Sequence, residues 1–160
     1  MVSSYNRNMR KEKIINFIVS VFIPIILGTF VGLLFKDDFD YIESLNRVIK
    51  VPTIIFPIVW SILYLLQGIW YFLYLKKERN QNIIAIYWAS MLVNLLFTPI
   101  LFSFHLNLLA TIIVIALLAL IGYLFYYSLK KDYKFGYLYV PYLLWLVVAL
   151  SLMVDILIHN

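Results

Sequence analysis

A run of 50 residues, 80–129, contains no Asp, Glu, Lys or Arg. About 20 apolar helical residues cross a bilayer core, so this run is too long for one span and fits two. Pro99 and the stretch Ser103–Asn107 place a turn between these two spans. Two further uncharged runs, Ile14–Phe35 and Val51–Leu75, are each long enough for one span. The sequence therefore predicts an all-α polytopic membrane protein rather than a soluble domain.

Composition agrees, because 64% of the residues are hydrophobic and only 13% are charged, whereas soluble domains carry about 25% charged residues. We expect a single domain, 1–160, built as a bundle of five transmembrane helices over 14–35, 53–75, 82–104, 106–129 and 136–158. The absence of Cys excludes disulfides, thiolate metal sites and Cys nucleophiles.

The distribution of cations predicts the orientation of the bundle. Lys and Arg cluster before the first expected span and after the second and fourth, with none in the turn between the third and fourth. By the positive-inside rule the N-terminus lies inside and the C-terminus outside. These flanking positions also account for the net charge of +5 without a nucleic-acid partner.

The segments at either end of the first span carry further predictions. The basic stretch Met1–Lys13 precedes an apolar run without a small-residue cleavage site, which favours a retained helix over a signal peptide. Within that helix, Pro24 predicts a kink, and the pair Gly28 and Gly32 predicts either close packing within the monomer or a dimer interface. The acidic loop Lys36–Lys50 has a partial apolar face, which indicates a short interfacial helix.

Polar side chains recur inside the expected spans. Trp60, Tyr64, Gln67, Tyr71 and Tyr74 follow helical spacing and share one face. A face with hydroxyls and an amide does not suit lipid, so it should point inward.

Asn94 lies near the middle of the third expected span, where it should form an interhelical hydrogen bond or contact a ligand. Asp155 should reach the interface or pair with a loop residue such as Arg47 or Lys50. His105, His159 and Asp155 are all expected on the outer side. Because they lack the spacing of metal ligands, we predict no metal site. No hydrolase, P-loop or dinucleotide-binding motif occurs, so we assign no catalytic residue.

Two motifs resemble the TspO/MBR family of tryptophan-rich sensory and translocator proteins. They are V-P-x-x-x-F-P-x-V-W-x-x-L-Y-x-x-x-G, from Val51 to Gly68, and P-Y-L-x-W-x-x-x-A, from Pro141 to Ala149. The resemblance covers essentially all of the chain after the first helix. It implies a five-helix bundle, often a homodimer, with a pocket beneath the first loop that binds porphyrins, haem or sterol-like molecules.

By this resemblance the ligand-binding residues would come from four helices. They would be Phe56, Val59, Trp60, Tyr64, Asn94, Phe97, Leu109, Trp145, Ala149 and Leu152. The chain departs from the family pattern at several positions. Ile54 and Phe97 replace tryptophans, Ser90 replaces a glutamine and Met153 replaces an asparagine, changes that bear on porphyrin affinity more than on the fold.

The function predicted from these residues and this resemblance is that of a receptor or sensor in the bacterial cytoplasmic membrane. It would bind a flat apolar ligand, with porphyrin or haem as ligand and no required cofactor. An enzyme that degrades porphyrin in light is an alternative, with Trp145 and Trp60 as the redox-active candidates. A transporter is a further alternative, although the spans lack the coupled charges and broken-helix repeats of that class.

Overall fold

The computed structural model describes residues 2–35, 38 and 40–160, with side-chain surroundings from Ile14 onward. In these residues helices are the only regular structure, and five helical segments are long and apolar enough to cross a membrane. Each segment begins and ends within two residues of the range predicted from the sequence. The prediction of an all-α, five-span membrane protein is confirmed.

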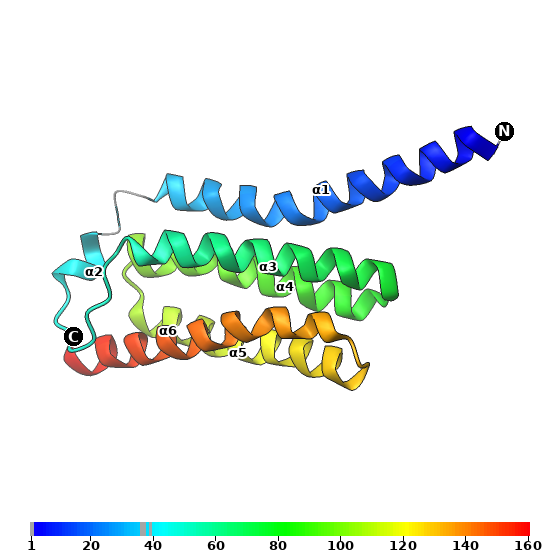
Figure 1. Cartoon of the computed structure of the whole chain (residues 1–160). Helices are drawn as coiled ribbons and strands as arrows, with labels where there is room; N and C mark the ends of the chain where they lie inside the picture. Colours follow the sequence, from blue (N-terminus) through cyan, green and yellow to red (C-terminus); the bar gives the residue numbers. More distant parts are fainter. Residues whose placement is uncertain (1, 36–37, 39) are drawn as a thin grey trace.

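The elements in chain order are α1 (Val2–Leu34), α2 (Asp40–Ser44), α3 (Ile55–Lys77), α4 (Gln81–Thr98), the π-helical turn η2 (Pro99–Ser103), α5 (Asn107–Lys130), the 3-10 helix η3 (Lys134–Tyr139) and α6 (Val140–His159). Helices α3 and α4 lie between α1 on one side and α5 with α6 on the other (Figure 1). The two termini lie at opposite ends of the bundle, as an odd number of spans requires (Figure 1). Which end faces the cytosol stays a prediction.

Close packing of α1 on α3 depends on two glycines. A Cβ atom at Gly68 would lie 2.7 Å from Cα of Val21 and 2.8 Å from the carbonyl oxygen of Ser20, so only glycine permits this approach. A Cβ atom at Gly28 would lie 2.0 Å from Cε2 of Tyr64. Gly28 therefore packs within its own chain, while the predicted homodimer stays a prediction.

The turn between α4 and α5 lies where proline and polar residues predict it. Pro99 begins the π-helical turn, and its carbonyl oxygen accepts a hydrogen bond from the amide of Phe104 at 2.9 Å. His105 follows with φ of 55°, a left-handed conformation that ends the helix. The chain then enters α5 at Asn107.

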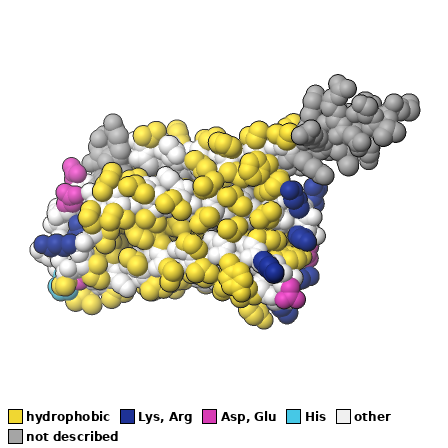
Figure 2. All heavy atoms as spheres, in the orientation of Figure 1, with side chains coloured by type: hydrophobic (Ala, Val, Ile, Leu, Met, Phe, Trp, Pro, Cys, Tyr) yellow, Lys and Arg dark blue, Asp and Glu magenta, His cyan; other side chains and the backbone are white. Residues whose placement is uncertain are grey.

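The outer surface of the bundle is apolar along its length, and charged side chains gather at its two ends (Figure 2). The polar stripe on α3 points inward as predicted. Tyr64, Gln67 and Tyr74 are buried, and Trp60 and Tyr71 are half-buried. Lipid therefore meets a mainly hydrophobic surface, while the polar groups of Tyr64, Gln67 and Tyr74 on this stripe are enclosed by other helices.

Short α2 belongs to the loop that joins α1 to α3, and its Ile42 is fully buried. Asp155 on α6 holds the same loop, since its Oδ2 accepts hydrogen bonds from the amides of Val48 and Ile49, each at 2.8 Å. Asp155 therefore pairs with residues of the loop, as expected, but through the backbone amides of Val48 and Ile49 and not through the side chains of Arg47 or Lys50. The carboxylate is buried beneath the loop, where backbone amides rather than long side chains reach it.

At the opposite end Glu78 joins the ends of α3 and α5. Its Oε2 accepts hydrogen bonds from the hydroxyls of Tyr127 at 2.9 Å and Tyr133 at 3.2 Å. Nζ of Lys131 lies 3.6 Å from its Oε1. The Tyr127 hydrogen bond, with the Lys131 charge and the Tyr133 hydrogen bond, lowers the pKa of Glu78.

Candidate functional site

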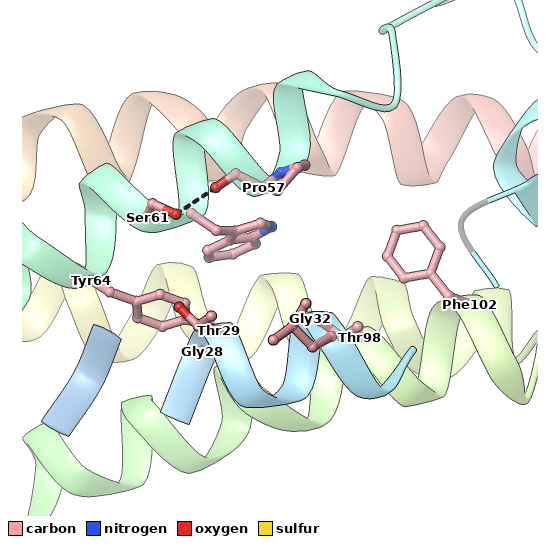
Figure 3. A pocket seen from close by; sticks show the side chains of 10 residues that line it. Gly28, Thr29, Gly32, Pro57, Ser61, Tyr64, Thr98 and Phe102 are labelled. Carbon is pink, nitrogen blue, oxygen red and sulfur yellow. Dashed lines mark hydrogen bonds between the residues drawn. The ribbon is translucent and has the colours of Figure 1, made fainter. Parts of the chain in front are cut away.

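A cavity of about 320 Å³ lies between α1, α3 and the α4–η2 segment, at the end of the bundle that carries α2 (Figure 3). Three helices contribute to its wall, and the residues that line it are Gly28, Thr29, Gly32, Leu33, Pro57, Trp60, Ser61, Tyr64, Thr98 and Phe102. Its volume falls within the range of about 300–1,000 Å³ that is typical of small-molecule pockets.

The cavity exists because of how the outer part of α1 meets α3. Gly28 lies directly against the ring of Tyr64, which closes one end of the space (Figure 3). One turn later, a Cβ atom at Gly32 would have no heavy atom of the described residues within 4 Å. The two glycines of one motif therefore do different things, since Gly28 permits contact and Gly32 leaves room.

The lining is apolar with a few hydroxyl groups, and among the described lining residues none is charged. Thr29, Ser61, Tyr64 and Thr98 supply the hydroxyls. Oγ of Ser61 donates to the carbonyl oxygen of Pro57 at 2.8 Å, so its lone pairs stay available as acceptors (Figure 3). Such a lining suits a largely apolar molecule with a small number of polar groups.

Trp60 is held in place by other rings. Its ring centroid lies 6.0 Å from that of Tyr64, 6.2 Å from that of Phe97 and 6.1 Å from that of Tyr142. Tyr142 is fixed in turn, because its hydroxyl accepts a hydrogen bond from the Asn94 amide. The predicted interhelical hydrogen bond of Asn94 is therefore present, and it links α4 to α6.

The structure places the sequence-predicted site residues in several environments. Trp60 and Tyr64 line the cavity. Phe56, Phe97 and Trp145 belong to the rings that pack beside it, with Phe56 in edge contact with Phe102 at 6.2 Å and with Trp145 at 5.8 Å.

The other predicted residues lie away from the cavity lining. Val59 is half-buried against the core, and Ala149 and Leu152 are buried in α6. Leu109 on α5 is 41% exposed, so its side chain faces the outer surface. Whether these residues contact a ligand stays a prediction.

The contribution of α1 to the cavity was not predicted. Gly28, Thr29, Gly32 and Leu33 all line it, and so do Pro57, Ser61, Thr98 and Phe102. The signal for α1 was the pair of glycines four residues apart, which we interpreted only as a helix-packing motif. A small-residue face beside a stripe of aromatic residues is also what a ligand pocket requires.

The histidines of the α2 end have other partners. His159 Nδ1 lies 3.0 Å from Asp155 Oδ1, and His105 stacks on Tyr41 with ring centroids 3.8 Å apart. Across the described residues, no group of three His, Cys, Asp or Glu side chains is arranged to hold a metal ion.

Comparison with known proteins agrees with this architecture. The chain is 28% identical over 122 residues to a tryptophan-rich sensory protein of Cereibacter sphaeroides, a match that covers 76% of this chain and 77% of the relative. The model of the TspO/MBR family matches residues 20–158, which include all of the cavity lining. On this match over most of its length, the protein belongs to the TspO/MBR family.

Proposed function

We propose that this protein is a membrane receptor or sensor whose ligand is a flat, largely apolar molecule bound in the cavity between α1, α3 and α4. The supporting observation is an uncharged cavity that has the rings of Trp60 and Tyr64 in its wall and hydroxyl groups around it. The family and the relative named as a sensory protein support the same role. The bacterial source of that relative is in keeping with a bacterial cytoplasmic membrane.

The ligand class follows from the lining together with the family resemblance. A planar ring system would stack on Trp60, whose position is fixed by Phe97 and Tyr142 behind it. Hydroxyls of Ser61 and Tyr64 would bind the few polar atoms of such a ligand. We therefore propose a tetrapyrrole, with a sterol-like molecule as the second choice.

The test is a titration of the purified protein with protoporphyrin, followed by quenching of tryptophan fluorescence. Gly32→Leu is the informative variant, because Gly32 lines the cavity and a Cβ atom there would meet no described atom within 4 Å. Gly122→Leu on α5 is the matched control, since its Cβ atom also meets no described atom within 4 Å and the residue lies outside the cavity lining.

We expect saturable quenching at micromolar porphyrin for the wild type and the Gly122 variant. The Gly32 variant should bind about tenfold more weakly or worse, since each 1.4 kcal/mol of lost contact energy reduces affinity tenfold. Absence of saturable quenching in the wild type would refute porphyrin as the ligand. Equal affinities of the two variants would show that ligand binds elsewhere.

A further inference from the structure

The end of the bundle opposite α2 carries a dense group of exposed cations, which we call the basic surface. They lie in two segments, at the junction of α3 with α4 and around the turn from α5 to η3, and are Lys76, Lys77, Arg79, Lys130, Lys131 and Lys134. Only two acids, Glu78 and Asp132, lie in the same segments. Figure 2 shows the lysine and arginine side chains gathered at this end.

The other end of the bundle has the opposite charge balance. Among the described residues it carries four acids and two cations, which are Asp38, Asp40, Glu43 and Asp155 against Arg47 and Lys50. The excess of positive charge therefore belongs to one end of the fold and not to the surface as a whole.

Specific contacts hold the two cationic segments side by side. Oε2 of Glu78 accepts hydrogen bonds from the hydroxyls of Tyr127 and Tyr133, and its Oε1 lies 3.6 Å from Nζ of Lys131. This ion pair uses the charge of Glu78 within the protein. The other five cations of the basic surface have no ion-pair partner among the described residues, so their charge is available to a partner outside the chain.

Exposed tyrosines place the basic surface at the depth of the lipid headgroups. Tyr123 and Tyr126 near the end of α5 are 45% and 59% exposed, and Tyr137 in η3 is 61% exposed. Tyrosine is typical of the membrane–water interface, where its ring lies among the headgroups. The apolar surface ends at the same level, since exposed Leu129 is followed directly by Lys130. The cations therefore face the phosphate layer of the bilayer.

We propose that the basic surface binds the phosphate groups of anionic phospholipids. Each Lys or Arg near an anionic membrane surface strengthens binding by about fivefold in affinity. The positive-inside rule explains such cations by the insertion of the chain, whereas this proposal gives them a binding role in the folded protein. In the predicted orientation the surface meets the cytoplasmic leaflet. The ligand cavity lies at the α2 end, so either proposal can fail without the other.

Quenching by spin-labelled lipid measures this preference. A fluorophore on Gln81→Cys, an exposed residue two positions after Arg79, reports lipid at the basic surface, and a fluorophore on Ser44→Cys reports lipid at the α2 end. Each protein is placed in phosphatidylcholine nanodiscs that contain a small fraction of phosphatidylglycerol or phosphatidylcholine with a doxyl label near the headgroup.

We expect labelled phosphatidylglycerol to associate with the Gln81 probe about fivefold or more in preference to labelled phosphatidylcholine. High salt should abolish this preference, because it screens exposed charges. The Ser44 probe should show no such preference, since acids outnumber cations at its end. Equal quenching of the Gln81 probe by the two lipids would overturn the proposal.

Two double variants separate the basic surface from a general effect of charge. Lys130→Gln with Lys134→Gln removes two of its exposed, unpaired cations, so the preference at the Gln81 probe should fall about fivefold for each. Arg47→Gln with Lys50→Gln is the matched control, because it removes the same charge from the α2 end and should leave that preference unchanged. An equal loss of preference in both double variants would overturn the proposal.

Inorganic phosphate distinguishes a lipid site from a site for the free anion. Millimolar phosphate, added at constant ionic strength, should leave quenching by labelled phosphatidylglycerol unchanged, since a lipid is concentrated in the plane of the membrane. Complete loss of the preference in phosphate would overturn the assignment to lipid and identify a site for the free anion.

Discussion

The two glycines of α1 allow a paired test of the cavity. Gly28→Ala would place a Cβ atom 2.0 Å from Cε2, 2.4 Å from Cδ2 and 2.7 Å from Cζ of Tyr64, well inside contact distance. The Tyr64 ring cannot move away freely, since it is 7% exposed and packs against Trp60. Gly32→Ala, one turn later on the same helix, would meet no described atom within 4 Å.

The expected magnitude follows from two opposing effects. Replacing glycine by alanine inside a helix favours folding by about 1 kcal/mol, and this gain is common to both variants. Overpacking a filled site costs roughly 1–3 kcal/mol, and this cost applies to Gly28 alone. The difference between the variants is therefore roughly 1–3 kcal/mol, or about 2–12 °C in melting temperature at 2–4 °C per kcal/mol.

Scanning fluorimetry on the four tryptophans measures both melting temperatures. We expect Gly28→Ala to melt below Gly32→Ala, and Gly32→Ala to melt at or slightly above the wild type. Displacement of Tyr64 should also weaken porphyrin binding in the Gly28 variant. Equal melting temperatures would refute the close contact between Gly28 and Tyr64. A loss of dimer in both variants, measured by light scattering, would instead place the two glycines at a dimer interface.

Two further predictions concern the loop between α1 and α3 and the orientation of the chain. Asp155→Ala removes the acceptor of two loop amide hydrogen bonds, so it should lower the free energy of unfolding by roughly 1.5–3 kcal/mol and speed proteolytic cleavage of the loop. An unchanged melting temperature and cleavage rate would contradict this role. Because the chain has no Cys, Ser44→Cys should react with an impermeant maleimide from outside the cell and Asn80→Cys should not; the reverse labelling would overturn the predicted orientation.

The fold was predictable from the sequence because bilayer physics leaves few choices. A continuous apolar run such as 80–129 lacks the alternation of barrel strands, so it crosses lipid as helices, and the thickness of the bilayer fixes their length. The inward face of α3 was predictable for the same reason, since hydroxyls and an amide at helical spacing are costly in lipid. The partner of Asp155 was not predictable, because sequence identifies side chains that can pair with a carboxylate but not backbone amides that a loop brings to it.

The cavity was predictable only in part, since Trp60 and Tyr64 were identified and the α1 wall was not. Aromatic residues that could line a cavity can be identified from the sequence. The cavity also requires that the facing helix α1 carries no side chain that would fill it. Gly28 and Gly32 are the same residue type on the same helix. The ring of Tyr64 packs against Gly28, whereas no described atom lies within 4 Å of a Cβ atom at Gly32. That distinction depends on the axial offset between α1 and α3, which the backbone contact at Gly68 sets.

The packing also gives a physical meaning to the predicted residues that do not line the cavity. Phe97 packs against Trp60, and Phe56 packs against both Trp145 and Phe102. Phe56 and Phe97 therefore support the lining residues Trp60 and Phe102 and are not part of the lining themselves. Phe97 therefore supports the indole of Trp60 without itself lining the cavity. If a ligand binds in the cavity as proposed, substitutions at Phe97 or Tyr142 should act on it through the indole of Trp60, because both rings pack against Trp60 and neither lines the cavity.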